Sequence, residues 1–202
     1  MLSWTLLLMQ LTSIAGGAPD PADAFSRPLG LPLLQTGEND VARLLGSGAP
    51  NGHEPFICYV APANDVFLRF LLDGYPRTNR RVSGFTMREL SGATAAPCAV
   101  LGSVVEERAR LSVGGLVLGM PRDEVIQLLA PDHESPGGDV FRHFIGLVTL
   151  TDEQRALVPR STRDFPEDGS VERHVLVSAG FRDDKLTEVD VKASWRMLPP
   201  AP

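Results

Sequence analysis

The sequence predicts an α+β fold made of two tandem copies of one small unit, each a helix followed by a three-stranded antiparallel meander. Two observations support this prediction. A Val-x-x-Leu-Leu helix pattern occurs twice, at residues 41–45 and 125–129. Each occurrence precedes three segments rich in β-branched and aromatic residues, separated by turn-forming residues. We expect both helices to pack on one sheet face, leaving the other face open.

The predicted units divide the 202 residues as follows. In chain order they are a signal peptide (1–18), a flexible lead-in (19–32), a first repeat (33–100), a linker (101–113), a second repeat (114–197) and a tail (198–202). An insert at residues 147–170 distinguishes the second copy, and the spacing of Thr151 and Gln154 there predicts a capped helical turn.

The N-terminus has the pattern of an export signal. Residues 2–15 form an apolar run that ends in small residues, and the run is shorter than the roughly 20 residues of a membrane span. No Lys or Arg precedes it, which leaves a buried N-terminal helix as the alternative. No Cys follows it, so we expect no lipid anchor. The predicted location is the periplasm or the extracellular space.

The two helices are predicted from their apolar spacing and their acidic first turns. The residues expected on their buried faces are Val41, Leu44 and Leu45 in the first helix and Val125, Leu128 and Leu129 in the second. The predicted strands are residues 56–60, 66–72 and 82–90 in the first copy and 140–144, 174–181 and 186–195 in the second. Alternation in the last strand places Glu188, Asp190 and Lys192 on the face away from the helices.

Cys58 and Cys98 are the two cysteines of the chain. In an exported protein an even number of cysteines indicates a disulfide, whereas in a cytosolic protein two buried thiols would be expected. Because the other features indicate export, we predict a Cys58–Cys98 bridge.

Composition and motifs argue against several function classes. The net charge of −6 and an aromatic content of 6% disfavour nucleic-acid binding. Neither a G-x-S-x-G nor an H-E-x-x-H motif occurs, and we expect no catalytic residue, metal or cofactor. His143 and His174 lie on strands predicted to be neighbours, and Glu172 could join them in a metal-dependent enzyme. The alternative is that the two histidines lie on opposite faces.

Residues 114–130 (GGLVLGMPRDEVIQLLA) and 174–191 (HVLVSAGFRDDKLTEVDV) resemble the BamE (SmpA/OmlA) and β-lactamase-inhibitor-protein group. The resemblance is weak over residues 33–90. Members of that group are secreted or periplasmic and act by binding proteins, so the resemblance implies protein binding without catalysis.

The open sheet face is therefore the predicted site of a non-catalytic protein-binding module in the cell envelope or extracellular space. The predicted partner is another protein of that compartment, with no nucleic acid and no stable membrane span. A metal-dependent enzyme or a structural envelope protein are the alternatives. The predicted partner-binding residues are Phe67, Arg69, Leu71, Thr86, Arg88, His174, Glu188, Asp190 and Lys192.

Overall fold

The structure is a computed structural model. It describes residues 20–47, 49–50, 55–62, 65–74, 80–90, 98–101, 111–157 and 169–197. The predicted signal peptide, the tail and most of the predicted linker lie outside these residues. Within the described ranges no helix is long and apolar enough to cross a membrane.

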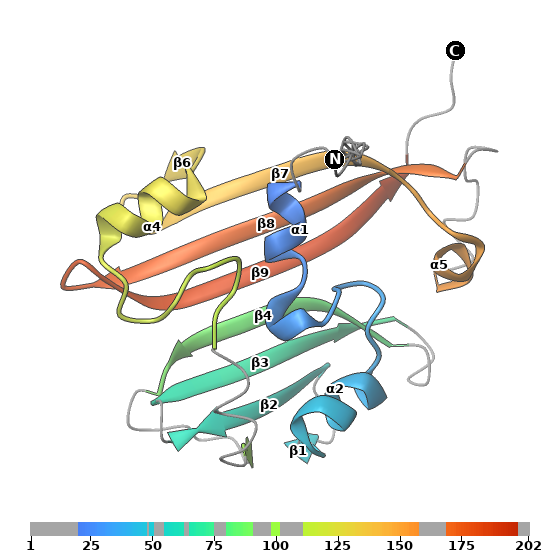
Figure 1. The fold of residues 1–202 in the computed structure, drawn as a ribbon, viewed down its shortest axis with the longest axis horizontal. Helices are drawn as coiled ribbons and strands as arrows, with labels where there is room; N and C mark the ends of the chain where they lie inside the picture. Colours follow the sequence, from blue (N-terminus) through green and yellow to red (C-terminus); the bar gives the residue numbers. More distant parts are fainter. Residues whose placement is uncertain are drawn as a thin grey trace, which may run out of the picture.

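The described residues form mainly β-strands, with a few short helices (Figure 1). The helices are α1 (Pro21–Phe25), a 3₁₀ turn (Pro28–Gly30), α2 (Glu38–Leu45), α4 (Arg122–Leu129) and α5 (Asp152–Leu157). The strands are β1 (Ala49–Pro50), β2 (Phe56–Ala61), β3 (Val66–Asp73), β4 (Arg81–Glu89), β5 (Ala99–Val100), β6 (His133–Glu134), β7 (Val140–Thr149), β8 (Ser170–Arg182) and β9 (Lys185–Met197).

All nine strands belong to one mixed sheet, ordered β1-β2-β3-β4-β9-β8-β7-β6, with β5 parallel to β2. The prediction of two helix-plus-meander copies is wrong, because β4 and β9 pair directly. Their antiparallel register runs from Gly84 opposite Lys192 to Arg88 opposite Glu188. Pairing of this kind removes two exposed strand edges, whose backbone groups would otherwise need other partners. Alternation within each strand does not reveal which strand will lie beside it.

One hydrophobic core extends across the junction between β4 and β9. Phe85 pairs with Val191 and Met87 pairs with Val189, and each of these side chains is at most 1% exposed. The same apolar cluster includes side chains from α2 at one end and α4 at the other. The two helices therefore cover a shared core rather than two separate ones.

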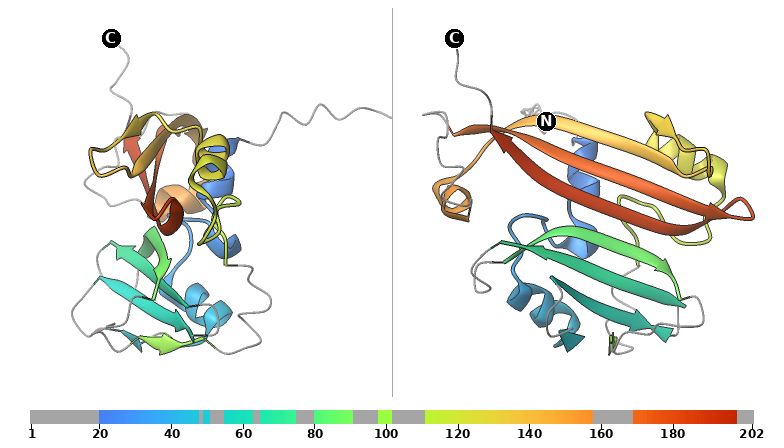
Figure 2. Two further views of the ribbon diagram at one scale, coloured as in Figure 1. Left: turned by 90° about the vertical axis from the view of Figure 1, so that its left-hand side faces the viewer. Right: turned by 180° about the vertical axis from the view of Figure 1, so that it is seen from behind.

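Helices α1, α2 and α4 lie on the same side of the sheet (Figures 1 and 2). The side chains that α2 and α4 bury are Val41 and Leu45 in the first and Val125 and Leu129 in the second. Leu44 and Leu128 were also expected to be buried, but they are 45% and 46% exposed. Each helix is about two turns long. Only the first and last apolar residues of the Val-x-x-Leu-Leu pattern, four positions apart, face the sheet, and the leucine between them faces away.

The predicted flexible lead-in is wrong for the residues that the structure describes. Helix α1 packs across the sheet, where Arg173 on β8 forms ion pairs with Asp20 (2.8 Å) and Asp23 (2.6 Å). Phe25 is 3% exposed and stacks on Phe144 of β7 with 5.4 Å between ring centroids. The Pro and Ala content of the segment indicated a loose chain, but these specific contacts fix it to the sheet.

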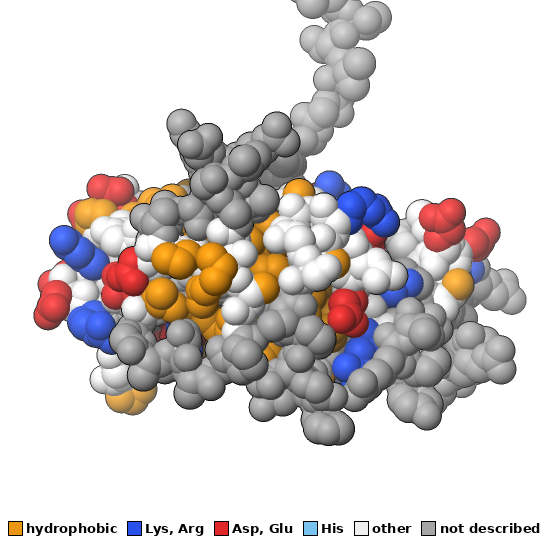
Figure 3. All heavy atoms as spheres, turned by 90° about the horizontal axis from the view of Figure 1, so that it is seen from below, with side chains coloured by type: hydrophobic (Ala, Val, Ile, Leu, Met, Phe, Trp, Pro, Cys, Tyr) orange, Lys and Arg blue, Asp and Glu red, His pale blue; other side chains and the backbone are white. Residues whose placement is uncertain are grey.

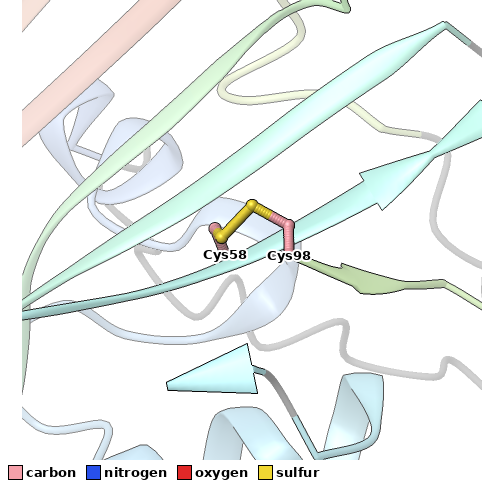
Figure 4. The surroundings of a disulfide bond; sticks show 2 residues. All are labelled: Cys58 and Cys98. Carbon is pink, nitrogen blue, oxygen red and sulfur yellow. A yellow bond between two sulfur atoms is a disulfide. The ribbon is translucent and has the colours of Figure 1, made fainter. Parts of the chain in front are cut away.

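The predicted disulfide is present. Cys58 on β2 is bonded to Cys98, which immediately precedes β5, and their Cα atoms are 5.0 Å apart (Figure 4). The bridge holds β5 beside β2, where Tyr59 pairs with Ala99 in parallel register.

The predicted capped turn in the insert is also confirmed. The backbone N–H of Thr151 donates to the Gln154 side chain at 2.9 Å, and the Gln154 N–H donates to Thr151 Oγ1 at 3.2 Å. Helix α5 follows, so the reciprocal hydrogen bonds that define a capping box begin this helix.

Candidate functional site on the open sheet face

The sheet face opposite α1, α2 and α4 is called the open face below. In the left view of Figure 2 these helices lie on one side of the strands, and no helix among the described residues covers the other side. Antiparallel pairs share a face, so the register shows which side chains line it. Its rows run across β3, β4, β9, β8 and β7.

A hydrogen-bonded row of polar side chains crosses the middle of the open face. Arg69 donates from Nη2 to Thr86 Oγ1 at 3.1 Å, and Thr86 Oγ1 lies 2.6 Å from Asp190 Oδ1. Lys192 completes the row with an ion pair to Asp190 at 3.4 Å. The structure thus brings together four of the predicted partner-binding residues, although Thr86 itself is only 4% exposed.

Phe67 and Leu71 were predicted to bind a partner, but they do not form an exposed apolar pair. Phe67 is only 7% exposed, and the guanidinium of Arg88 lies 4.6 Å from its ring centroid. Leu71 is half-buried and lies against the position of Gly84 on β4. Arg88 and its cross-strand neighbour Glu188 are exposed instead, so this part of the face presents charge.

His143 and His174 lie on the same face and touch each other. His143 Nε2 is 3.1 Å from His174 Nδ1, and His174 Nε2 is 3.3 Å from Glu172 Oε2. The three side chains form a linear chain of contacts. Across the described part of the molecule, no group of three or more His, Cys, Asp or Glu side chains converges on a metal position.

The contacts of His174 bear on nucleophilic chemistry. Ser194 is its cross-strand neighbour on β9. Both ring nitrogens of His174 already face other groups, Nδ1 toward His143 and Nε2 toward Glu172. A histidine that activates a serine nucleophile must direct one ring nitrogen at the serine hydroxyl. Neither nitrogen of His174 is directed at Ser194.

Sequence reasoning missed three exposed apolar side chains on β7 and β8, at one end of the open face. Ile145 is 59% exposed, Leu147 is 67% exposed, and Leu176 on β8 is 39% exposed. Ile145 and Leu147 were missed because the strand was predicted to end at residue 144, whereas β7 continues to Thr149. Ile145 and Leu147 follow His143 at every second position, as side chains on one face of a strand do. This alternation could have been used to extend the predicted strand beyond residue 144.

The open face therefore has two zones. The apolar zone comprises Ile145, Leu147 and Leu176 together with His143 and His174. The charged zone comprises Arg69, Arg88, Glu188, Asp190 and Lys192. The two zones adjoin through β8 and β9, where Leu176 is the cross-strand neighbour of Lys192.

Another surface of the molecule also carries apolar side chains. Figure 3, which views the structure from the bottom of Figure 1, shows hydrophobic side chains gathered between charged ones. An exposed apolar residue outside the open face is Leu44 on α2, which is 45% exposed. It provides a comparison for the apolar zone.

No protein-family model matches the chain, and neither a curated protein nor a solved structure matches it. The resemblance to the BamE and β-lactamase-inhibitor-protein group stays a prediction.

Proposed function

We propose that the protein is an exported, non-catalytic binding module that holds another exported protein on its open sheet face. The observation that carries this proposal is the apolar zone. Three large aliphatic side chains that could pack in a core are instead directed outward from two adjacent strands.

The exposure of the apolar zone is costly unless a partner covers it. Ile145 and Leu147 are more than half exposed, and Leu176 on β8 lies diagonally across from Ile145. Contiguous apolar surface that is bordered by polar residues is typical of protein-binding sites. Burying these three side chains removes apolar area from water, at about 25 cal/mol per Å².

The charged zone supports recognition of a protein rather than a nucleic acid. It presents Arg69, Arg88 and Lys192 together with Glu188 and Asp190, so both signs of charge are interspersed. A nucleic-acid site would need an excess of positive charge to neutralise phosphates. Mixed charges at the border of an apolar patch orient a partner and exclude wrong ones.

Two features support export. The disulfide between Cys58 and Cys98 is a bond that persists in oxidising compartments. The apolar run at residues 2–15 has the length and composition of a signal-peptide core. We therefore expect the partner to be in the periplasm or outside the cell.

The test is site-specific photo-crosslinking in the native cell. A photoreactive residue at Leu147 is expected to capture a defined partner, which mass spectrometry identifies and which is then purified. Binding of this partner is measured for the wild type, Ile145→Asp and Leu44→Asp. Because Leu44 is similarly apolar and exposed on α2, Leu44→Asp is the matched control.

We expect Ile145→Asp to weaken binding at least tenfold, which corresponds to about 1.4 kcal/mol, and Leu44→Asp to leave it unchanged. Equal effects of both substitutions, or capture only of a second copy of this chain, would contradict the proposal.

A further inference from the structure

The paired histidines of the apolar zone have a geometry that protein binding does not require. His143 lies on β7 and His174 on β8, and their pairing is diagonal, since His143 is opposite Leu176 and His174 is opposite Ile145. The rings meet edge to edge through His143 Nε2 and His174 Nδ1, 3.1 Å apart, with ring centroids 5.1 Å apart.

This separation suits two ligands of one metal ion. A transition metal binds imidazole nitrogen at about 2.0–2.1 Å, so two nitrogens at angles of about 90–109° lie about 2.8–3.4 Å apart. The observed 3.1 Å falls within this interval. Binding of one ion would require His143 to carry its proton on Nδ1 and both rings to turn until their lone pairs meet on the solvent side.

Glu172 holds His174 in the tautomer that metal binding needs. Its carboxylate accepts from His174 Nε2 at 3.3 Å, so that nitrogen carries the proton and Nδ1 presents a lone pair toward His143. A carboxylate that orients a metal-binding histidine through its second nitrogen is a recurrent arrangement in metal sites.

The backbone of His143 is also fixed. Its N–H donates to Asp132 Oδ2 at 2.8 Å, and the other oxygen of Asp132 accepts from Arg142 Nη1 at 2.6 Å. On the other strand, His174 is only 18% exposed in its side chain. The His143 backbone and the His174 side chain are therefore held in place before any ion arrives, which lowers the entropy cost of binding.

We propose that His143 and His174 form a two-histidine site for a divalent transition metal ion, with water completing the coordination. Imidazole nitrogen favours Cu²⁺, Zn²⁺ and Ni²⁺ over Mg²⁺ and Ca²⁺, and Cu²⁺ binds most tightly in this series. The site needs no ligand from the proposed protein partner, because both protein ligands belong to this chain.

The test titrates the purified, disulfide-bonded chain with CuSO₄ and with ZnSO₄ by calorimetry, and measures the electron paramagnetic resonance of the Cu²⁺ form. The variants are His143→Ala, His174→Ala, Glu172→Gln and His133→Ala. His133 is exposed on β6 with no second histidine at hydrogen-bonding distance among the described residues, so it is the matched control.

We expect one Cu²⁺ per chain at this site, with a signal from two coordinated imidazole nitrogens. His143→Ala and His174→Ala should each leave one nitrogen and weaken binding at least tenfold, and Glu172→Gln should weaken it about 10-fold. His133→Ala should change nothing. Binding that is equally strong in His143→Ala, in His174→Ala and in the wild type overturns the proposal, as does a wild type that binds neither ion. Circular dichroism of each variant checks that the fold is retained.

Discussion

Thr86 Oγ1 on β4 lies 2.6 Å from Asp190 Oδ1 on β9, although the two residues are 104 positions apart in the chain. Thr86 also accepts from Arg69 on β3, so its hydroxyl connects three strands. This contact lies on the open face, directly above the backbone pairing that joins the two halves of the sheet. It is a side-chain link across a junction that the sequence did not predict.

Thr86→Val should destabilise the protein by about 1–2 kcal/mol. The substitution keeps the β-branched shape but removes the hydroxyl, which leaves Arg69 and Asp190 without this partner. Urea unfolding followed by circular dichroism measures the change. Thr86→Ser, which keeps the hydroxyl, should retain more stability than Thr86→Val. A valine variant as stable as the wild type would show that the contact contributes nothing.

Met87→Ala should destabilise the protein by about 2–5 kcal/mol. Met87 is 0% exposed and lies between Leu68 on β3 and Val189 on β9, so truncation leaves a cavity at the junction of the two halves. Leu44→Ala is the control, because Leu44 is 45% exposed and should change stability by only about 0.5 kcal/mol. Similar losses from both substitutions in thermal unfolding would be inconsistent with a core at this position.

Removing the disulfide should cost about 4 kcal/mol in the chain-entropy description, because Cys58 and Cys98 are 40 residues apart. The comparison is guanidinium unfolding of the wild type, oxidised and reduced, with the Cys58→Ala/Cys98→Ala variant. The reduced wild type and the double variant should unfold at similar denaturant concentrations, well below the oxidised protein. If all three unfold together, the bridge does not stabilise the fold.

Phe25→Ala should destabilise the protein by about 3–5 kcal/mol, since it removes a buried ring that stacks on Phe144. Gly114→Ala should also be destabilising, because its Cβ would clash with the Phe25 ring and its backbone has φ of +57°. Thermal unfolding of both variants measures the effect. Phe25→Leu is the control: it keeps an apolar side chain at this position and should lower the stability less than Phe25→Ala. Stability unchanged by Phe25→Ala would mean that α1 is not held on the sheet.

Local features of the fold were predictable because local physics determines them. The helix positions, the strand alternation in β9 and the Cys58–Cys98 bridge follow from periodicity and cysteine chemistry. Val189 and Val191 are buried as predicted, and Lys192 and Glu188 are exposed.

Long-range features were not predictable from the same patterns. The β4–β9 pairing depends on which of several apolar strands meet, and no local signal encodes that choice. The docking of α1 depends on Arg173, which is distant in sequence from Asp20 and Asp23. For the same reason the sequence left open whether His143 and His174 share a face, and it placed Phe67 on the surface although Arg88 covers it.

The continuity of the sheet determines the open face, because it places the charged zone beside the apolar zone. Nuclear Overhauser effects between β4 and β9 test it most directly, in a protein labelled with ¹⁵N and ¹³C. We expect cross-strand effects between Phe85 and Val191 and between Met87 and Val189, with slow amide exchange in both strands. Rapid exchange in β4 and β9 without cross-strand effects would mean two separate sheets, and would contradict this account.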